Sequence, residues 1–168
     1  MIFIPWLKYR TKKAEKSGKD LRKSVGYSQA ENIGILYYNN DHNKIDAAEK
    51  LSTLIKMDGK KVKVIAYEKK STVKHLPYDT FTKENFSFWG TLIGKPINDF
   101  VDLSFDFVIC LDRQPNIFLQ NILATSKAKC RIGRYKKDNQ QLFEMLIEEK
   151  KPGNDWVNSV YDYLKIIS

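Results

Sequence analysis

Two apolar runs separated by one amphipathic segment constrain the fold of this chain more than any other feature. Residues 32–38 (NIGILYY) are a continuous apolar run, typical of a strand buried on both faces of a parallel sheet, and residues 61–67 (KVKVIAY) predict the next strand. Between them, apolar residues recur at helical spacing over residues 44–58, and Gly59 follows where a left-handed helix cap is favoured. Strand, helix and strand within about 36 residues predict a right-handed βαβ unit.

The remaining pattern extends this unit into a larger sheet. Residues 105–111 (FDFVICL) predict a further buried strand, and Pro115 opens the helix that follows it. In residues 128–134 (AKCRIGR) polar and apolar residues alternate, which predicts a strand near a sheet edge with Lys129 and Arg131 on a solvated face. Residues 141–149 favour a last strand over a helix, and residues 155–167 form a final helix. The predicted fold is a three-layer, Rossmann-like α/β sandwich with a mostly parallel sheet.

Two regions do not follow this alternation. Residues 68–103 are rich in aromatic residues, glycine and proline, and we expect a short helix or turn, a short strand at 86–89 and irregular chain. Residues 1–30 are interpreted as a basic, partly helical arm that precedes a single domain at 31–168, with Gly18 ending its helix. The opening MIFIPWL is too short for a signal peptide, and no apolar run is long enough to span a membrane, so a cytoplasmic location is expected.

The positive charge of the chain is concentrated in two segments. The net charge is +9, yet residues 1–27 alone carry eight basic against two acidic residues, and residues 126–137 carry six basic residues and no acid. The remainder is therefore mildly acidic. This asymmetry predicts a polyanionic partner, the alternative being a basic surface that only aids solubility. The predicted contacts are Lys8, Arg10, Lys12, Lys13, Lys127, Lys129, Arg131, Arg134, Lys136 and Lys137.

Small ligands of open parallel sheets bind beyond the carboxyl ends of the strands, which points to two polar loops. Asn40, Asp41, Arg113 and Asn116 lie in these loops, where a small anion could meet a helix N-terminus. Neither loop has the glycines of a nucleotide-binding motif, so no cofactor is expected. We also find no catalytic motif, and polar turn residues such as these commonly cap helices.

Metal binding is not expected either. Cys110 and Cys130 lie in strand-like runs and are interpreted as buried free thiols. His42 and His75 are solitary, without the spacing of a metal site.

Part of the chain resembles a known enzyme family. Residues 105–134 are similar to a segment in the N-terminal, Rossmann-like half of heptosyltransferase-type glycosyltransferases, where a strand and helix lead to a run ending in RIG. The matching residues are Phe105, Asp106, Val108, Ile109, Leu111, Ser126, Ala128, Arg131, Ile132 and Gly133. The resemblance implies an acceptor-binding half-domain, but NNDHN replaces the Gly-Asp loop expected after the first strand, and a chain of 168 residues has no room for the donor-binding domain.

The whole chain is more similar to a small bacterial family of stand-alone domains without an assigned activity. The shared features are the FD strand, the SKAK-RIGR segment, the FWG region and the terminal helix. That similarity implies a fold and no reaction.

These observations predict a non-catalytic module that binds a phosphate-rich partner, RNA or a ribonucleoprotein such as the ribosome. Two alternatives stay open. One is an acceptor-binding or vestigial glycosyltransferase half that acts with a protein partner. The other is a membrane-surface protein, in which MIFIPWL enters the headgroups and the neighbouring lysines meet anionic lipid.

Overall fold

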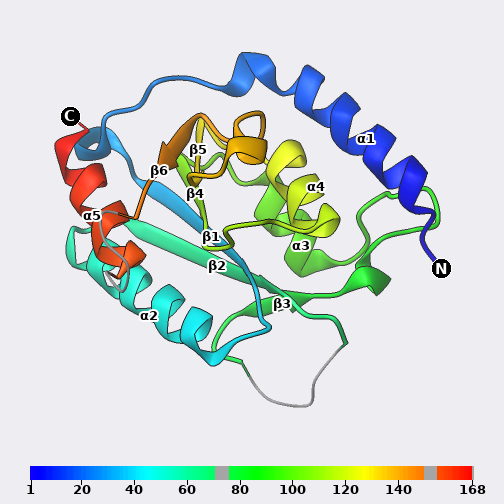
Figure 1. Ribbon diagram of the computed structural model, residues 1–168, viewed down its shortest axis with the longest axis horizontal. Helices are drawn as coiled ribbons and strands as arrows, with labels where there is room; N and C mark the ends of the chain where they lie inside the picture. The colour runs from blue at the N-terminus through cyan, green and yellow to red at the C-terminus, as the bar shows by residue number, and fades with distance from the viewer. Residues whose placement is uncertain (71–75, 150–154, 168) are drawn as a thin grey trace.

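The computed structural model describes residues 1–70, 76–149 and 155–167 and contains a six-stranded parallel sheet (Figure 1). The strands are β1 (Asn32–Tyr38), β2 (Lys61–Tyr67), β3 (Asp79–Phe81), β4 (Phe107–Cys110), β5 (Cys130–Arg134) and β6 (Met145–Ile147). Their order in the sheet is β3-β2-β1-β4-β5-β6, and every neighbouring pair is parallel. This is the order of dinucleotide-binding Rossmann domains. The predicted fold class is confirmed.

Helices cover both faces of the sheet. On one face lie α2 (His42–Met57) and α5 (Trp156–Ile166), and on the other lie α1 (Ile4–Ser17), α3 (Lys95–Asp102) and α4 (Ile117–Thr125). Successive residues of β1 point to opposite faces of the sheet: Ile35 packs in the core under α2 and α5, and Leu36 packs in the core on the other face. The central strands β1, β2 and β4 thus contribute to two separate hydrophobic cores, as expected for a doubly wound sheet.

Several predicted elements have the expected bounds, and others differ. β1 and β2 match the predicted strands residue for residue, and Gly59 has the expected positive φ of 78°. The third strand is β3 at Asp79–Phe81; the segment predicted as a strand at 86–89 contributes only an isolated bridge between Phe86 and Leu92. The turn expected after Glu68 lies partly outside the described residues. The helix α3 was not predicted, because it has only eight residues and its apolar face is confined to the short stretch after Pro96.

The prediction of a solvated face on β5 is wrong. Cys130, Arg131, Ile132 and Gly133 are all buried, and β6 rather than β5 forms the sheet edge. The alternation of basic and apolar residues indicates an exposed face only when no other element packs on the basic face of the strand. α1 lies over this end of the sheet and packs on α4 (Figure 1), so that Arg131 lies inside the protein.

The first helix is held against the domain by specific contacts. Leu7 is fully buried in the core beneath α1, and Asn121 of α4 donates a hydrogen bond of 2.9 Å to the hydroxyl of Thr11. After α1, the Arg22 guanidinium donates to carbonyl oxygens around the C-terminal end of α4, including that of Ser126 at 3.0 Å. Cations favour such helix ends because the last carbonyl groups lack partners.

Candidate functional site

The polar loop at the reversal of strand order is held by internal hydrogen bonds. Asp112 follows β4, accepts a hydrogen bond of 2.7 Å from the backbone N–H of Tyr38 and pairs with the Lys44 ammonium group. The same ammonium group donates to the side-chain oxygen of Asn40 at 2.7 Å. Lys44 therefore joins the loops after β1 and β4, and both side-chain acceptors are used within the protein.

Two of the predicted loop residues cap helices. Asp41 accepts a hydrogen bond of 3.0 Å from the backbone N–H of Asn43 at the start of α2. Asn116 accepts two, each of 3.0 Å, from Phe118 and Leu119 at the start of α4. Side chains of this kind satisfy the unpaired N–H groups of a helix start. The remaining loop residue, Arg113, is exposed and lines a cavity of about 420 Å³ with Arg134, Tyr135, Ile147, Glu148 and Glu149.

Most basic residues of the second charged segment pair with carboxylates. Lys127 lies 3.0 Å from Asp102, Lys129 lies 2.7 Å from Asp106 and Arg134 lies 2.7 Å from Glu149. Arg134 also stacks over the ring of Trp156, with 4.7 Å from its guanidinium carbon to the ring centroid. Together with Arg131, four of the six predicted phosphate contacts in residues 126–137 thus already face an acid.

Arg131 is the most deeply placed of these cations, since its side chain is only 1% exposed. Its guanidinium forms paired hydrogen bonds with both oxygens of Glu15 at 2.7 Å and with both oxygens of Glu144 at 2.6 and 3.0 Å. A side chain buried to this extent and occupied by two carboxylates cannot also contact a macromolecule. Arg131 is therefore a structural residue that ties α1 to β5, and we remove it from the candidate contacts.

Electrostatics reinforce this cluster. Burial by itself lowers the pKa of Arg131, but the hydrogen bonds that it donates to Glu15 and Glu144 outweigh burial and raise its pKa. Burial by itself raises the pKa of Glu144, and the hydrogen bonds with Arg131 reverse this effect, so that the pKa of Glu144 is lowered. Arg131 and Glu144 therefore stay charged throughout the physiological pH range.

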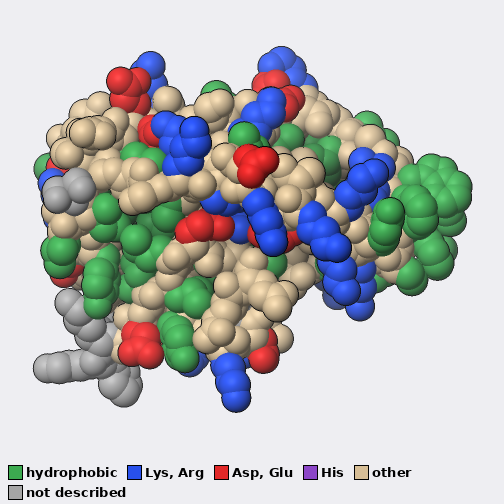
Figure 2. All heavy atoms as spheres, turned by 90° about the horizontal axis from the view of Figure 1, so that it is seen from above, with side chains coloured by type: hydrophobic (Ala, Val, Ile, Leu, Met, Phe, Trp, Pro, Cys, Tyr) green, Lys and Arg blue, Asp and Glu red, His purple; other side chains and the backbone are tan. Residues whose placement is uncertain are grey.

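The basic residues of α1 have a different environment. Lys8, Arg10, Lys12 and Lys13 are exposed, and no carboxylate of the described residues lies within 4.0 Å of their charged groups. Figure 2 views the molecule from the side of α1 and shows Lys and Arg side chains on this face. This helix therefore presents cations whose charge is not already compensated by a neighbour.

One cavity brings the two charged segments together. It has a volume of about 400 Å³ and lies between α1, the start of α4 and the chain after β5. Lys8 and Lys12 from the first segment and Lys136 from the second line it. The other lining residues are Thr11, Glu15, Gln114, Pro115, Ile117, Gln120, Asp138, Gln141 and Leu142. Lys136 donates to the Gln114 side chain at 2.8 Å, which positions its ammonium group at the cavity. Three lysines and three glutamine amides around one hollow can donate hydrogen bonds to phosphate oxygens.

Aromatic side chains gather beside this helix at the end of the molecule that carries the N-terminus (Figure 2). The ring of Phe3 stacks on that of Phe88 at 5.9 Å, and the ring of Trp6 meets that of Trp89 edge-on at 5.7 Å. All four rings are at least 38% exposed. Phe88 and Trp89 were not among the residues predicted to form a site. The aromatic run FSFWG marks them in the sequence, but only the fold shows that their rings contact Phe3 and Trp6.

Other kinds of site find no support among the described residues. These contain no group of three or more His, Cys, Asp or Glu side chains able to hold a metal ion. His75 lies outside the described residues. Within the same part of the chain, no helix combines the length and apolar character needed to cross a bilayer. Both cysteines are buried free thiols, as predicted.

Comparison with known proteins identifies a family. Among curated proteins no match is found. A family model described as a family of unknown function (DUF6913) matches residues 5–167, which is nearly the whole chain and includes α1. The chain therefore belongs to this family.

Proposed function

We propose that this protein is a non-catalytic binding module for a phosphate-rich partner, RNA or a ribonucleoprotein such as the ribosome. The observation that carries the proposal is the cavity lined by Lys8, Lys12 and Lys136, because it joins cations from both basic segments at one place. Lysine ammonium groups on such a surface neutralise phosphates and release the counterions around the nucleic acid. Arg10 and Lys13 add exposed cations on the opposite flank of the same helix.

Among the residues predicted from sequence, α1 is the main contact in this proposal. Lys127, Lys129 and Arg134 would have to leave a carboxylate to reach a phosphate, whereas Lys8 and Lys12 would not. Lys136 and Lys137 complete the surface from the side of β5. The partner is therefore expected to lie across α1 rather than along the sheet edge.

The salt dependence of binding tests the proposal. The affinity for a fluorescently labelled RNA hairpin, measured by anisotropy from about 50 to 200 mM salt, should fall linearly on a log–log plot. The double variant K8Q/K12Q should reduce the magnitude of the slope by about 1.4 to 1.8, because each lost phosphate contact contributes about 0.7 to 0.9. The control K56Q/K61Q removes the same charge from exposed lysines of α2 and β2. Absence of RNA binding, or equal slopes for the two double variants, would refute the proposal.

A second candidate is the acceptor-binding half-domain that the glycosyltransferase-like segment suggests. One observation favours it: Arg113 and Tyr135 line a cavity of about 420 Å³ beyond the carboxyl ends of β5 and β6, on the edge of the sheet at which parallel α/β sheets bind ligands. It predicts that a sugar phosphate raises the melting temperature and that R113Q abolishes this rise. K8Q/K12Q should leave it unchanged, which separates the two candidates.

A further inference from the structure

A second cavity lies on the opposite flank of α1. It has a volume of about 310 Å³, at the lower end of the range for small-molecule sites, and lies between α1, the loop around Gly90 and α4. Its lining residues are Trp6, Tyr9, Arg10, Lys13, Ala14, Ser17, Gly90, Leu92, Asn121 and Thr125. With 3.6 residues per turn, these positions of α1 face away from Lys8, Thr11, Lys12 and Glu15, which line the first cavity. The helix thus separates two hollows.

The aromatic rings at the second cavity are exposed yet held in place by each other. The ring of Trp6 lies 5.1 Å from that of Tyr9 and 5.7 Å from that of Trp89, and the three side chains are 38, 54 and 58% exposed. Gly90 permits this arrangement, since its φ is 75° and an added Cβ would lie 3.2 Å from Leu7. The loop backbone therefore packs closely on α1 and places Trp89 beside Trp6.

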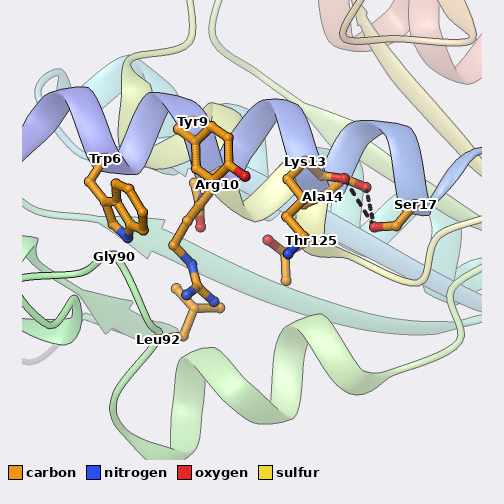
Figure 3. A pocket seen from close by; sticks show the side chains of 10 residues that line it. Trp6, Tyr9, Arg10, Lys13, Ala14, Ser17, Gly90, Leu92 and Thr125 are labelled. Atoms are coloured by element: carbon orange, nitrogen blue, oxygen red, sulfur yellow. Dashed lines mark hydrogen bonds between the residues drawn. The ribbon is translucent and has the colours of Figure 1, made fainter.

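Cationic and hydrogen-bonding groups share the same hollow. Figure 3 shows Trp6 and Arg10 projecting from α1 toward the loop at Gly90 and Leu92, with Thr125 lying below Lys13 and Ala14. The cavity therefore offers a flat ring at one end, two cations along its length and the polar side chains of α4 on its far wall. This combination matches an unpaired nucleotide, whose base stacks on an aromatic ring while its phosphates meet Arg or Lys.

A bilayer surface is a poorer match to the same residues. Aromatic side chains and lysines also mark membrane-surface proteins, in which an apolar face enters the headgroup region. Here, however, the aromatic residues border a hollow that also contains Arg10, Lys13, Asn121 and Thr125. Lipid chains entering this hollow would remove the exposed side chains of Arg10, Lys13 and Thr125 from water without giving them partners, which is unfavourable.

We propose that the cavity beside Trp6 binds an unpaired base of a single-stranded RNA segment, stacked on Trp6 or Tyr9, with Arg10 and Lys13 on the adjoining phosphates. This rests on the proposed RNA-binding function and specifies its substrate. The phosphate chain would then cross α1, with further phosphates at Lys8 and Lys12 on the other flank. The protein should accordingly prefer unpaired RNA over a duplex of the same sequence.

The test compares a labelled single-stranded 12-mer RNA with the same strand in a perfect duplex, by fluorescence anisotropy. The variant W6L keeps an apolar side chain and removes the flat ring; it should weaken binding of the single strand by roughly 5- to 100-fold and leave duplex binding unchanged. W6F, which keeps a ring, should retain most of the affinity. Y135L removes a similarly exposed ring that lines a different cavity and should have no effect. W89L removes the neighbouring ring on the loop and should likewise weaken binding of the single strand. Circular dichroism confirms that each variant is folded.

The outcomes separate this inference from the function on which it rests. If W6L and W89L bind the single strand as the unmodified protein does, while K8Q/K12Q weakens both RNAs, the stacking site is refuted and the proposed function stands. If neither RNA binds, both fail. If W6L instead abolishes sedimentation with vesicles containing phosphatidylserine and leaves RNA binding unchanged, the aromatic surface is a membrane contact and the inference is overturned.

Discussion

Replacement of Arg131 by methionine tests the claim that a buried ion cluster fixes α1 to the sheet. The guanidinium of Arg131 is 1% exposed and forms two paired sets of hydrogen bonds, one with Glu15 of α1 and one with Glu144 before β6. Methionine keeps an unbranched side chain at this position and carries no charge. R131M therefore leaves two carboxylates facing each other in a region prepared for a cation, and R131M should destabilise the protein.

The size of the effect follows from the burial of the partners. Removal of one member of a buried pair costs about 3 to 5 kcal/mol, because the remaining charge is desolvated and unpaired. The side chains of Glu15 and Glu144 are 27 and 28% exposed, so water can partly solvate them once Arg131 is gone. We therefore expect the lower end, about 3 kcal/mol. With a urea dependence of about 2 kcal/mol per M, the midpoint of unfolding should fall by about 1.5 M.

Urea unfolding of the unmodified protein and three variants provides the assay. The triple variant R131M/E15Q/E144Q removes all three charges and should recover much of the lost stability, since neutral groups of similar shape replace buried ion pairs at little cost. K127M is the matched control: Lys127 and Asp102 form an exposed pair, and its loss should cost less than about 1 kcal/mol. If R131M unfolds within about 0.5 kcal/mol of the unmodified protein, the ion cluster does not anchor α1 and the reasoning is refuted.

Three further perturbations test other parts of the structure. Burial alone would raise the pKa of Asp106, but hydrogen bonds donated by Lys129 and by two backbone N–H groups lower this pKa. The ionised Asp106 carboxylate therefore stabilises the folded protein above about pH 3.9, the pKa of an unperturbed Asp, and this stabilisation is lost as the pH falls through the lower pKa of the folded state. The stability gap between the unmodified protein and D106N should therefore narrow as the pH is lowered from 6 to 3 in urea titrations, and a constant gap would contradict this. G133A would place a Cβ 2.5 Å from the ring of Phe143 and should cost about 1 to 3 kcal/mol in thermal unfolding; an unchanged melting temperature would mean that the ring moves freely. Burial raises the pKa of the Cys130 thiol to about 12, so a thiol reagent at pH 8 should label it only after urea is added, whereas rapid labelling of the folded protein would show that the strand opens.

The central strands and helices were predictable because each carries a complete pattern within its own residues. β1 is a nearly continuous apolar run, β2 ends in the apolar run Val64–Tyr67, and α2 combines an apolar stripe with Asp41 at its start and Gly59 just beyond its end. β3 and α3 were missed because three strand residues and one short apolar face do not stand out in an aromatic, proline-containing segment. Such short elements form because the sheet and the core stabilise them.

Part of the candidate site was likewise predictable from the sequence, and part became apparent only in the structure. The charge asymmetry of the chain identified the cations of α1 without reference to structure, since Lys8 and Lys12 lie in a segment with few acids. The pairing of Lys127, Lys129 and Arg131 could not be read from residues 126–137, because their partners Asp102, Asp106, Glu15 and Glu144 lie elsewhere in the chain. Likewise, no local pattern relates Trp89 to Trp6.

Local periodicity alone thus determined that this chain builds a doubly wound parallel sheet, because the hydrophobic pattern of a strand or helix is written in consecutive residues. Which cations remain available to a partner was decided only by the tertiary structure. A basic side chain is neutralised or left free by the acids that folding brings within a few ångströms, and Coulomb interactions depend on that distance and on burial rather than on separation along the chain. For this reason Arg131 became part of the interior, while Lys8 and Lys12 stayed at the surface.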